Sequence, residues 1–172
     1  MKKNSHVSLN DQRGSSLTEY LLYAALAGIV VVGATKMYNS SQNATQANQL
    51  LSDLQGIRSG AQSLATNGQY VGLSMDTLAN AKALPSTIRK SGTNWLSNLN
   101  TNVTISVNAS NSGKFDLVVQ QVPAEICMKT ISALDGSWIA KVGTSTLTLP
   151  APDITTINAA CSGTADITLT AA

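Results

Sequence analysis

The chain has 172 residues, of which 4% are aromatic and 12% charged, and its formal net charge is +2. This length allows one ordinary domain with an appendage. The excess charge lies in residues 1–14, because the rest of the chain carries eight Lys or Arg and eight Asp or Glu. A neutral body offers no basic face, so no direct binding to nucleic acid is expected.

The residues that usually carry catalysis are scarce. His6 is the only histidine, and it lies within the first fourteen residues. If those residues are removed, Ser-His-Asp and Cys-His catalysis and the usual zinc sites are excluded. The sequence also has no glycine-rich phosphate-binding motif. We therefore expect neither an enzyme nor a bound cofactor.

An apolar segment begins shortly after Arg13. Between Glu19 and Lys36 lie sixteen uncharged residues, YLLYAALAGIVVVGAT. As a helix this stretch is about 24 Å long, and a snorkelling Lys36 extends its reach toward the ~30 Å hydrocarbon core. A signal-peptide cut after the apolar run would discard a helix whose pattern continues onward. Cleavage before the run fits the pattern better.

The helical pattern then becomes amphipathic. Apolar residues recur in steps of three or four, with polar residues and Arg58 on the opposite face. No proline interrupts residues 15–66, and Asn67-Gly68 is a good stop signal. The sequence predicts one long helix over 15–66, apolar all round at first and then amphipathic. The apolar stripe of its second half is Ala47, Leu50, Leu54, Ile57, Ala61 and Leu64.

The remainder favours an antiparallel sheet. Alternating stretches at 102–110 and 114–122 predict a hairpin with an Asn-Ser-Gly turn, and Pro123 opens a short helix at its first position. Residues 137–142 and 164–170 predict further strands, separated by a proline-bearing loop at 148–153. Residues 70–84 are expected to cover one edge as a loop with a helical turn. The predicted fold is α+β, with the sheet packed on the amphipathic half of the long helix.

The segment RGSSLTE at residues 13–19 resembles the processing site of type IV prepilins, in which a short basic leader ends in Gly and Glu is the fifth mature residue. The segment NGQYVGLSMDTLANAKALPSTIR at 67–89 is similar to the corresponding segment of type IVb pilins, including those of conjugative thin pili. Together the matches cover about residues 1–90. Ser15 departs from the family, since most relatives carry a larger apolar first residue.

This resemblance implies a pilin fold and a division of the chain into four parts. Residues 1–14 would be the leader, cut by prepilin peptidase after Gly14 so that Ser15 becomes the first, methylated residue. Residues 15–38 would be the transmembrane and polymerisation half of the helix, 39–66 its amphipathic half, and 67–172 the globular head.

The resemblance also implies partners and a location. The expected partners are further copies of the chain, prepilin peptidase, the assembly machinery and lipid of the inner membrane. The head would lie in the periplasm and, after assembly, in an extracellular fibre for adhesion, aggregation or conjugation. Glu19 would be neutralised by the Ser15 amine of a neighbouring subunit. The alternative is a Glu19 that sits solvated and unpaired at the headgroup interface.

Cys127 and Cys161 are the only cysteines. In an extracytoplasmic domain we expect them to form a disulfide, which would stabilise the fold by about 4 kcal/mol in the chain-entropy model. Two buried free thiols and a metal site remain as alternatives. Trp95 and Trp138 are expected in the core rather than on an adhesive surface.

Two other functions remain open. A minor pilin or a type II secretion pseudopilin would share the N-terminal features, although a pseudopilin should have a calcium-binding acidic cluster, and Asp153 and Asp166 are isolated. A single-pass anchored periplasmic binding or enzymatic domain is the alternative of a different class.

Overall fold

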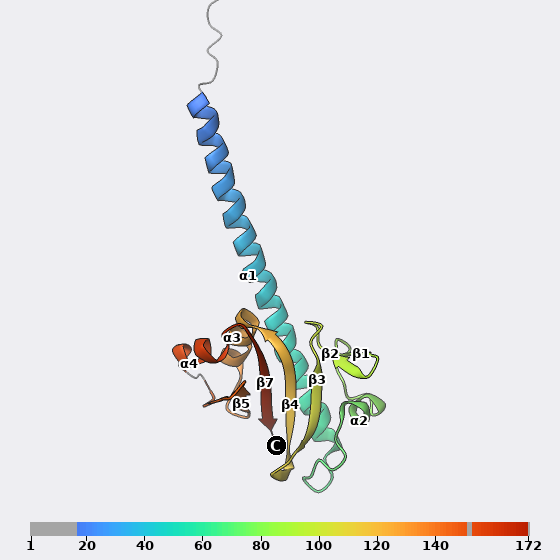
Figure 1. Cartoon of the computed structure of the whole chain (residues 1–172). Coiled ribbons are helices and arrows are strands. Elements are labelled where there is room, and N and C mark those ends of the chain that lie inside the picture. The colour runs from blue at the N-terminus through green and yellow to red at the C-terminus, as the bar shows by residue number, and fades with distance from the viewer. Residues whose placement is uncertain (1–16, 151–152, 172) are drawn as a thin grey trace, which may run out of the picture. The chain divides into compact units, whose positions relative to one another are not determined.

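The computed structural model describes residues 17–150 and 153–171. The first helix, α1, runs over Leu17–Leu64, which agrees with the predicted long helix within the described residues. The chain divides into two compact units, with the boundary between Ser40 and Ser41. The first unit contains the N-terminal half of α1, and the second, called the head below, contains the remainder (Figure 1).

The head has a five-stranded antiparallel sheet in the order β3-β4-β7-β5-β6. These strands are β3 (Val103–Asn108), β4 (Asn111–Pro123), β5 (Ile139–Val142), β6 (Ser145–Leu147) and β7 (Thr164–Ala171). Two short strands, β1 (Arg89–Ser91) and β2 (Asn94–Leu96), form a separate antiparallel pair. Three further helices are α2 (Met75–Asn80), α3 (Ala124–Ala133) and α4 (Ile154–Ala160). The α+β fold is therefore confirmed.

The core lies between α1 and the sheet. Inward positions alternate along the long strand β4, where Phe115, Leu117 and Val119 are fully buried. The predicted stripe on α1 packs into the same cluster over Ala47, Leu50, Leu54, Ile57 and Ala61. Apolar side chains repeat every two residues along the strands and about every 3.6 residues along α1, so each element has one apolar face. These faces pack against each other and form one apolar layer. Leu64, the last residue of the predicted stripe, is at the exposed margin.

Local signals explain where elements begin and end. Helix α1 ends two residues before the predicted boundary, and Asn67 and Gly68 then turn the chain with positive φ angles of 53° and 72°. At the start of α2, Ser74 and Thr77 form a capping box, in which each side chain accepts from the other residue's backbone N–H. This short helix confirms the helical turn expected within residues 70–84.

The hairpin is present, but its predicted turn is wrong by three residues. The chain reverses between Asn108 and Asn111, where the Asn108 side-chain oxygen accepts from the N–H groups of Ser110 and Asn111. This side chain satisfies two turn donors, so Asn111-Ser112-Gly113 is free to begin β4. Pro123 ends β4 and precedes α3, rather than occupying its first helical position.

Four short elements were not expected. Residues 143–163 contain β6 and α4 as well as the predicted proline-bearing loop, and residues 89–96 form the small β1–β2 pair. All are at most seven residues long, which is too short for a clear periodic signal. Trp138 is buried as expected, whereas Trp95 is half-buried and packs against the edge of the core.

Candidate functional site

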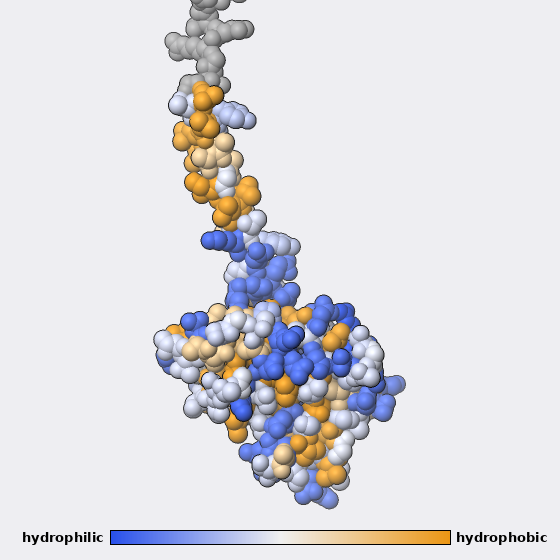
Figure 2. Space-filling view, in the orientation of Figure 1, coloured by the Kyte–Doolittle hydropathy of each residue, from blue (hydrophilic) through white to orange (hydrophobic). Residues whose placement is uncertain are grey.

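The exposed apolar surface of the N-terminal unit is its main chemical feature. Twelve large hydrophobic residues between Leu17 and Tyr38 each expose more than half of their surface. In Figure 2 the hydrophobic colour predominates along this stretch of the helix. Among the described residues, α1 is long and apolar enough to cross a membrane. The twelve are Leu17, Tyr20, Leu21, Leu22, Tyr23, Leu26, Ile29, Val30, Val31, Val32, Met37 and Tyr38.

Glu19 is the carboxylate predicted to direct assembly, and it lies exposed in the first turn of α1. The end of a helix where N–H groups are unpaired favours a negative side chain. The other two predicted processing and assembly residues, Gly14 and Ser15, lie outside the described residues, as does the leader at 1–14. Lys36, the expected interface anchor, is exposed toward the other end of the apolar stretch.

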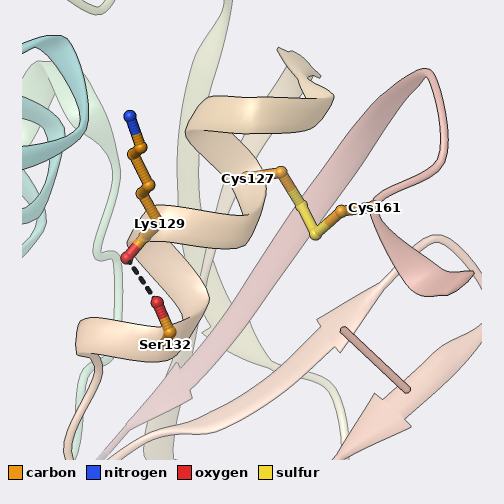
Figure 3. Close-up of a disulfide and its surroundings, with 4 residues drawn as sticks. All are labelled: Cys127, Lys129, Ser132 and Cys161. Atoms are coloured by element: carbon orange, nitrogen blue, oxygen red, sulfur yellow. Dashed lines mark hydrogen bonds between the residues drawn. A yellow bond between two sulfur atoms is a disulfide. The ribbon is translucent and has the colours of Figure 1, made fainter. Parts of the chain in front are cut away.

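Cys127 and Cys161 form the predicted disulfide, with their Cα atoms 5.8 Å apart. Cys127 lies on α3, and Cys161 follows α4 directly (Figure 3). Both half-cystines are buried, and the two helices pack against each other. The alternatives of free thiols and of a metal site on these sulfurs are thereby excluded. The bond closes the segment that carries β5, β6 and α4.

A polar network joins the start of the head to α3. Glu125, in the first turn of α3, accepts a hydrogen bond from the Asn43 side chain on α1 at 2.5 Å. Its other oxygen pairs with Lys129 at 2.8 Å, one helical turn further along. Through these contacts, α3 is held beside the first turn of α1 within the head.

Several carboxylates of the head stabilise local backbone or side chains. Asp166 accepts from the backbone N–H of Gln121 at 2.8 Å, at a β-bulge in β4 where φ is 51°. Asp116 accepts from Asn108 and Thr170, which join β4 to its neighbours β3 and β7. Within the described parts of the chain, no group of three His, Cys, Asp or Glu side chains is placed to hold a metal ion.

Sequence reasoning missed Asp53, which faces inward from α1 and is only 2% exposed. One oxygen of its carboxylate accepts from Thr87 at 2.6 Å and from Gln49 at 3.0 Å. The other oxygen is buried without a hydrogen-bond partner. The spacing was a usable signal, because Asp53 follows Leu50 by three residues and precedes Ile57 by four.

Arg58 was assigned to the polar face of α1, and this is wrong. Its guanidinium lies 5.0 Å from the ring centroid of Trp138 and donates to the Ser137 hydroxyl. The Ser137 hydroxyl and N–H in turn donate to Asp135 and, with the nearby charge of Arg58, hold the pKa of that carboxyl below its usual value. A long cationic side chain can cover an aromatic ring and still reach solvent, and Arg58 is therefore half-buried rather than fully exposed.

The comparisons with known proteins add a family. The search of curated proteins finds no match to this chain. The family model described as PilS N terminal matches residues 41–172, which cover the whole head and most of the chain. The long helix on an antiparallel sheet and the exposed apolar N-terminal half agree with this match. The chain therefore belongs to the PilS N-terminal family, a family related to the type IV pilins.

Proposed function

We propose that this chain is a structural subunit of a type IVb pilus. Prepilin peptidase cuts it after Gly14, and the apolar half of α1 then holds the subunit in the inner membrane with its head in the periplasm. The assembly machinery moves subunits from the bilayer into an extracellular fibre. The role of the subunit is to assemble into this fibre, and the fibre serves adhesion, aggregation or conjugation.

The exposed apolar surface of residues 17–38 is the observation that carries this proposal. Burying a large hydrophobic side chain stabilises by about 1.5–3 kcal/mol, so removing all twelve from water would contribute on the order of 20 kcal/mol. Lipid can cover this surface before assembly. Identical helices can cover it afterwards, because they offer the same kind of surface.

Glu19 supplies specificity in this scheme. A carboxylate among apolar helices is costly unless a cation meets it. Cleavage after Gly14 creates the Ser15 amine, and this amine on one subunit pairs with Glu19 on another. Processing therefore creates the charge that fixes the register of assembly, since unprocessed chains lack the partner.

The intact mass of membrane-extracted protein tests the proposal. We expect a chain that begins at Ser15. A chain with its first fourteen residues intact, from a host that contains the peptidase, would contradict the proposal and favour an anchored periplasmic domain. A cut after Ala34 would instead identify an ordinary secreted domain. Electron microscopy of cells with and without the gene then shows whether fibres depend on this subunit.

A further inference from the structure

The strand β7 is the last element of the chain and has a central place in the sheet. It lies between β4 and β5 and pairs antiparallel with both. Buried and outward residues alternate along it: the buried ones are Ile167, Leu169 and Ala171, and Thr168 and Thr170 lie between them. Because this pattern repeats every two residues, it cannot distinguish the observed register from one displaced by two residues.

A displacement of β7 by two residues toward the start of β4 would keep the same kinds of side chain in contact. In the observed register Thr170 lies opposite Asp116 and donates to its carboxylate. After the displacement, Thr168 would lie opposite Asp116 and offer the same hydroxyl. Residues 111–114 of β4 have no partner in the described part of β7, so the displaced strand would pair with backbone that it does not now use.

The displaced register would gain an ion pair with β5. Lys141 lies opposite Thr168 in the observed register, and its side chain is exposed. After a displacement by two residues it would lie opposite Asp166 on the same outward face. Opposite charges directly across an antiparallel pair are stabilising. The displaced register is therefore a real competitor of the observed one.

One contact that belongs to the observed register is made at a bulge in β4. The register shifts between Val119 and Val122, opposite Asp166. The Asp166 carboxylate accepts from the Gln121 N–H at 2.8 Å, and Gln121 has a φ of 51°. A displacement by two residues moves β7 by about 6.8 Å, so Asp166 would leave this N–H group. Asp166 thus gains one contact and loses another, and it does not decide between the registers.

The disulfide is the second contact specific to the observed register. Cys127 lies on α3, which follows β4 directly, and only two residues separate Cys161 from β7. The bond therefore joins the chain just beyond the end of the ladder at which Pro123 pairs with Thr164. A displacement of about 6.8 Å exceeds the width of the Cα–Cα range that disulfides allow, about 4.4–6.8 Å. The bond thus opposes the displacement.

We propose that the disulfide between Cys127 and Cys161 selects the register of β7, and that its reduction lets β7 move by two residues toward the start of β4. The head is then a redox-sensitive device with two arrangements of one sheet. The cysteines decide between them, because the alternating pattern fits both arrangements and the charges of Asp166 and Lys141 favour the displaced one. This inference does not depend on the proposed function, and its test needs no fibre.

Nuclear magnetic resonance of the full chain in detergent micelles tests the register. In the oxidised chain the main-chain protons of Val118 and Thr168 should show a nuclear Overhauser effect, because these residues are opposed. Dithiothreitol reduces the disulfide to two thiols and is itself oxidised to its cyclic disulfide. The reduced chain should show a new effect between Asp116 and Thr168. The double variant Cys127→Ser with Cys161→Ser should show it without any reductant.

Two results would overturn the inference. One is a reduced chain and a double variant that retain only the effect between Val118 and Thr168, because the register would then not depend on the bond. The other is the loss of all effects between β4 and β7, because the strand would then leave the sheet instead of moving along it.

A charge substitution tests the displaced pairing independently. In the double serine variant, Lys141→Glu should lower the fraction of the displaced register at least fivefold, because two carboxylates would face each other there. Lys141→Arg should retain that fraction. The matched control is Lys82→Glu, which makes the same charge change at an exposed residue outside the sheet and should have no effect. An unchanged fraction in Lys141→Glu would overturn the proposed displaced register.

Discussion

Gly60 on α1 lies directly against the backbone of Ala83, because a Cβ atom added at Gly60 would stand 2.3 Å from the Ala83 carbonyl oxygen. One turn earlier, a Cβ at Gly56 would meet the Pro85 ring at 2.7 Å. The segment after α2 therefore rests on a glycine-lined strip of α1. This close approach fixes where residues 83–85 cross the helix.

The first prediction concerns this crossing. Gly60→Ala should destabilise the head by about 2 kcal/mol, because the backbone of Ala83 cannot move aside and over-packing outweighs the gain in helix propensity. Gly56→Ala should cost less, since it meets a side-chain ring. Urea unfolding followed by the fluorescence of buried Trp138 measures both, with exposed Ser59→Ala as the control. Equal stability of Gly60→Ala and the unaltered chain would contradict the close contact.

A second prediction concerns the buried carboxylate of Asp53. Thr87→Val keeps the shape of the side chain and removes the hydroxyl that donates to Asp53 at 2.6 Å. We expect a loss of about 1.5–3 kcal/mol in the free energy of unfolding, because a buried carboxylate loses a donor. The control is Thr146→Val on the exposed edge strand β6. A loss no larger than that of the control would show that Asp53 does not depend on Thr87.

Asp53 also shows what sequence patterns can and cannot predict. The apolar stripe correctly placed Leu50, Leu54 and Ile57 in the core, since helical period alone determines the shared face. The same period puts Asp53 on that face, but a carboxylate is expected to lie in solvent when no hydrogen-bond partner for it is known. Its partner Thr87 is 34 residues away and becomes visible only when residues 83–88 cross α1.

The strands and short helices also divide into those that the sequence predicts and those that it does not. β3, β4 and β7 were predicted because their β-branched alternation is long enough to read. Helix α4 was missed since its sequence, ITTINAA, is rich in residues with poor helix propensity and depends on packing against α3. For the candidate site, the expected extracytoplasmic compartment predicted the disulfide, whereas the packing of α3 against α4 required the tertiary fold.

The third prediction concerns pH and Asp76 on α2. Lys90 donates to this carboxylate at 2.6 Å and holds its pKa below the usual value. A depressed folded-state pKa means that the contribution to stability is present above the unfolded-state pKa, about 3.9, and is lost as pH falls through the folded-state value. The stability advantage over Asp76→Asn should therefore be constant from pH 7 to about 5 and vanish near pH 2.

Unfolding midpoints of the two proteins across this range measure the effect. Added salt should reduce the difference at pH 7, because both partners are exposed and screened. Lys90→Gln is the matched control, since it should remove the pH-dependent difference between Asp76 and Asn at this position. A difference that persists unchanged at pH 2 would contradict the assignment.

The fourth prediction separates processing from assembly at Glu19. Glu19→Ala should still yield a membrane-bound chain that begins at Ser15, because the Gly14 cleavage position is unchanged. It should fail to form fibres, since the Ser15 amine of a neighbouring subunit would enter the apolar helix bundle without its counter-charge. Glu19→Gln should fail as well, because it keeps the size and loses the charge. Intact mass and electron microscopy give the two readouts, and Thr18→Ala serves as the adjacent control. Normal fibres from Glu19→Ala would mean that packing of the apolar helices alone sets the register, and the carboxylate would have no part in assembly.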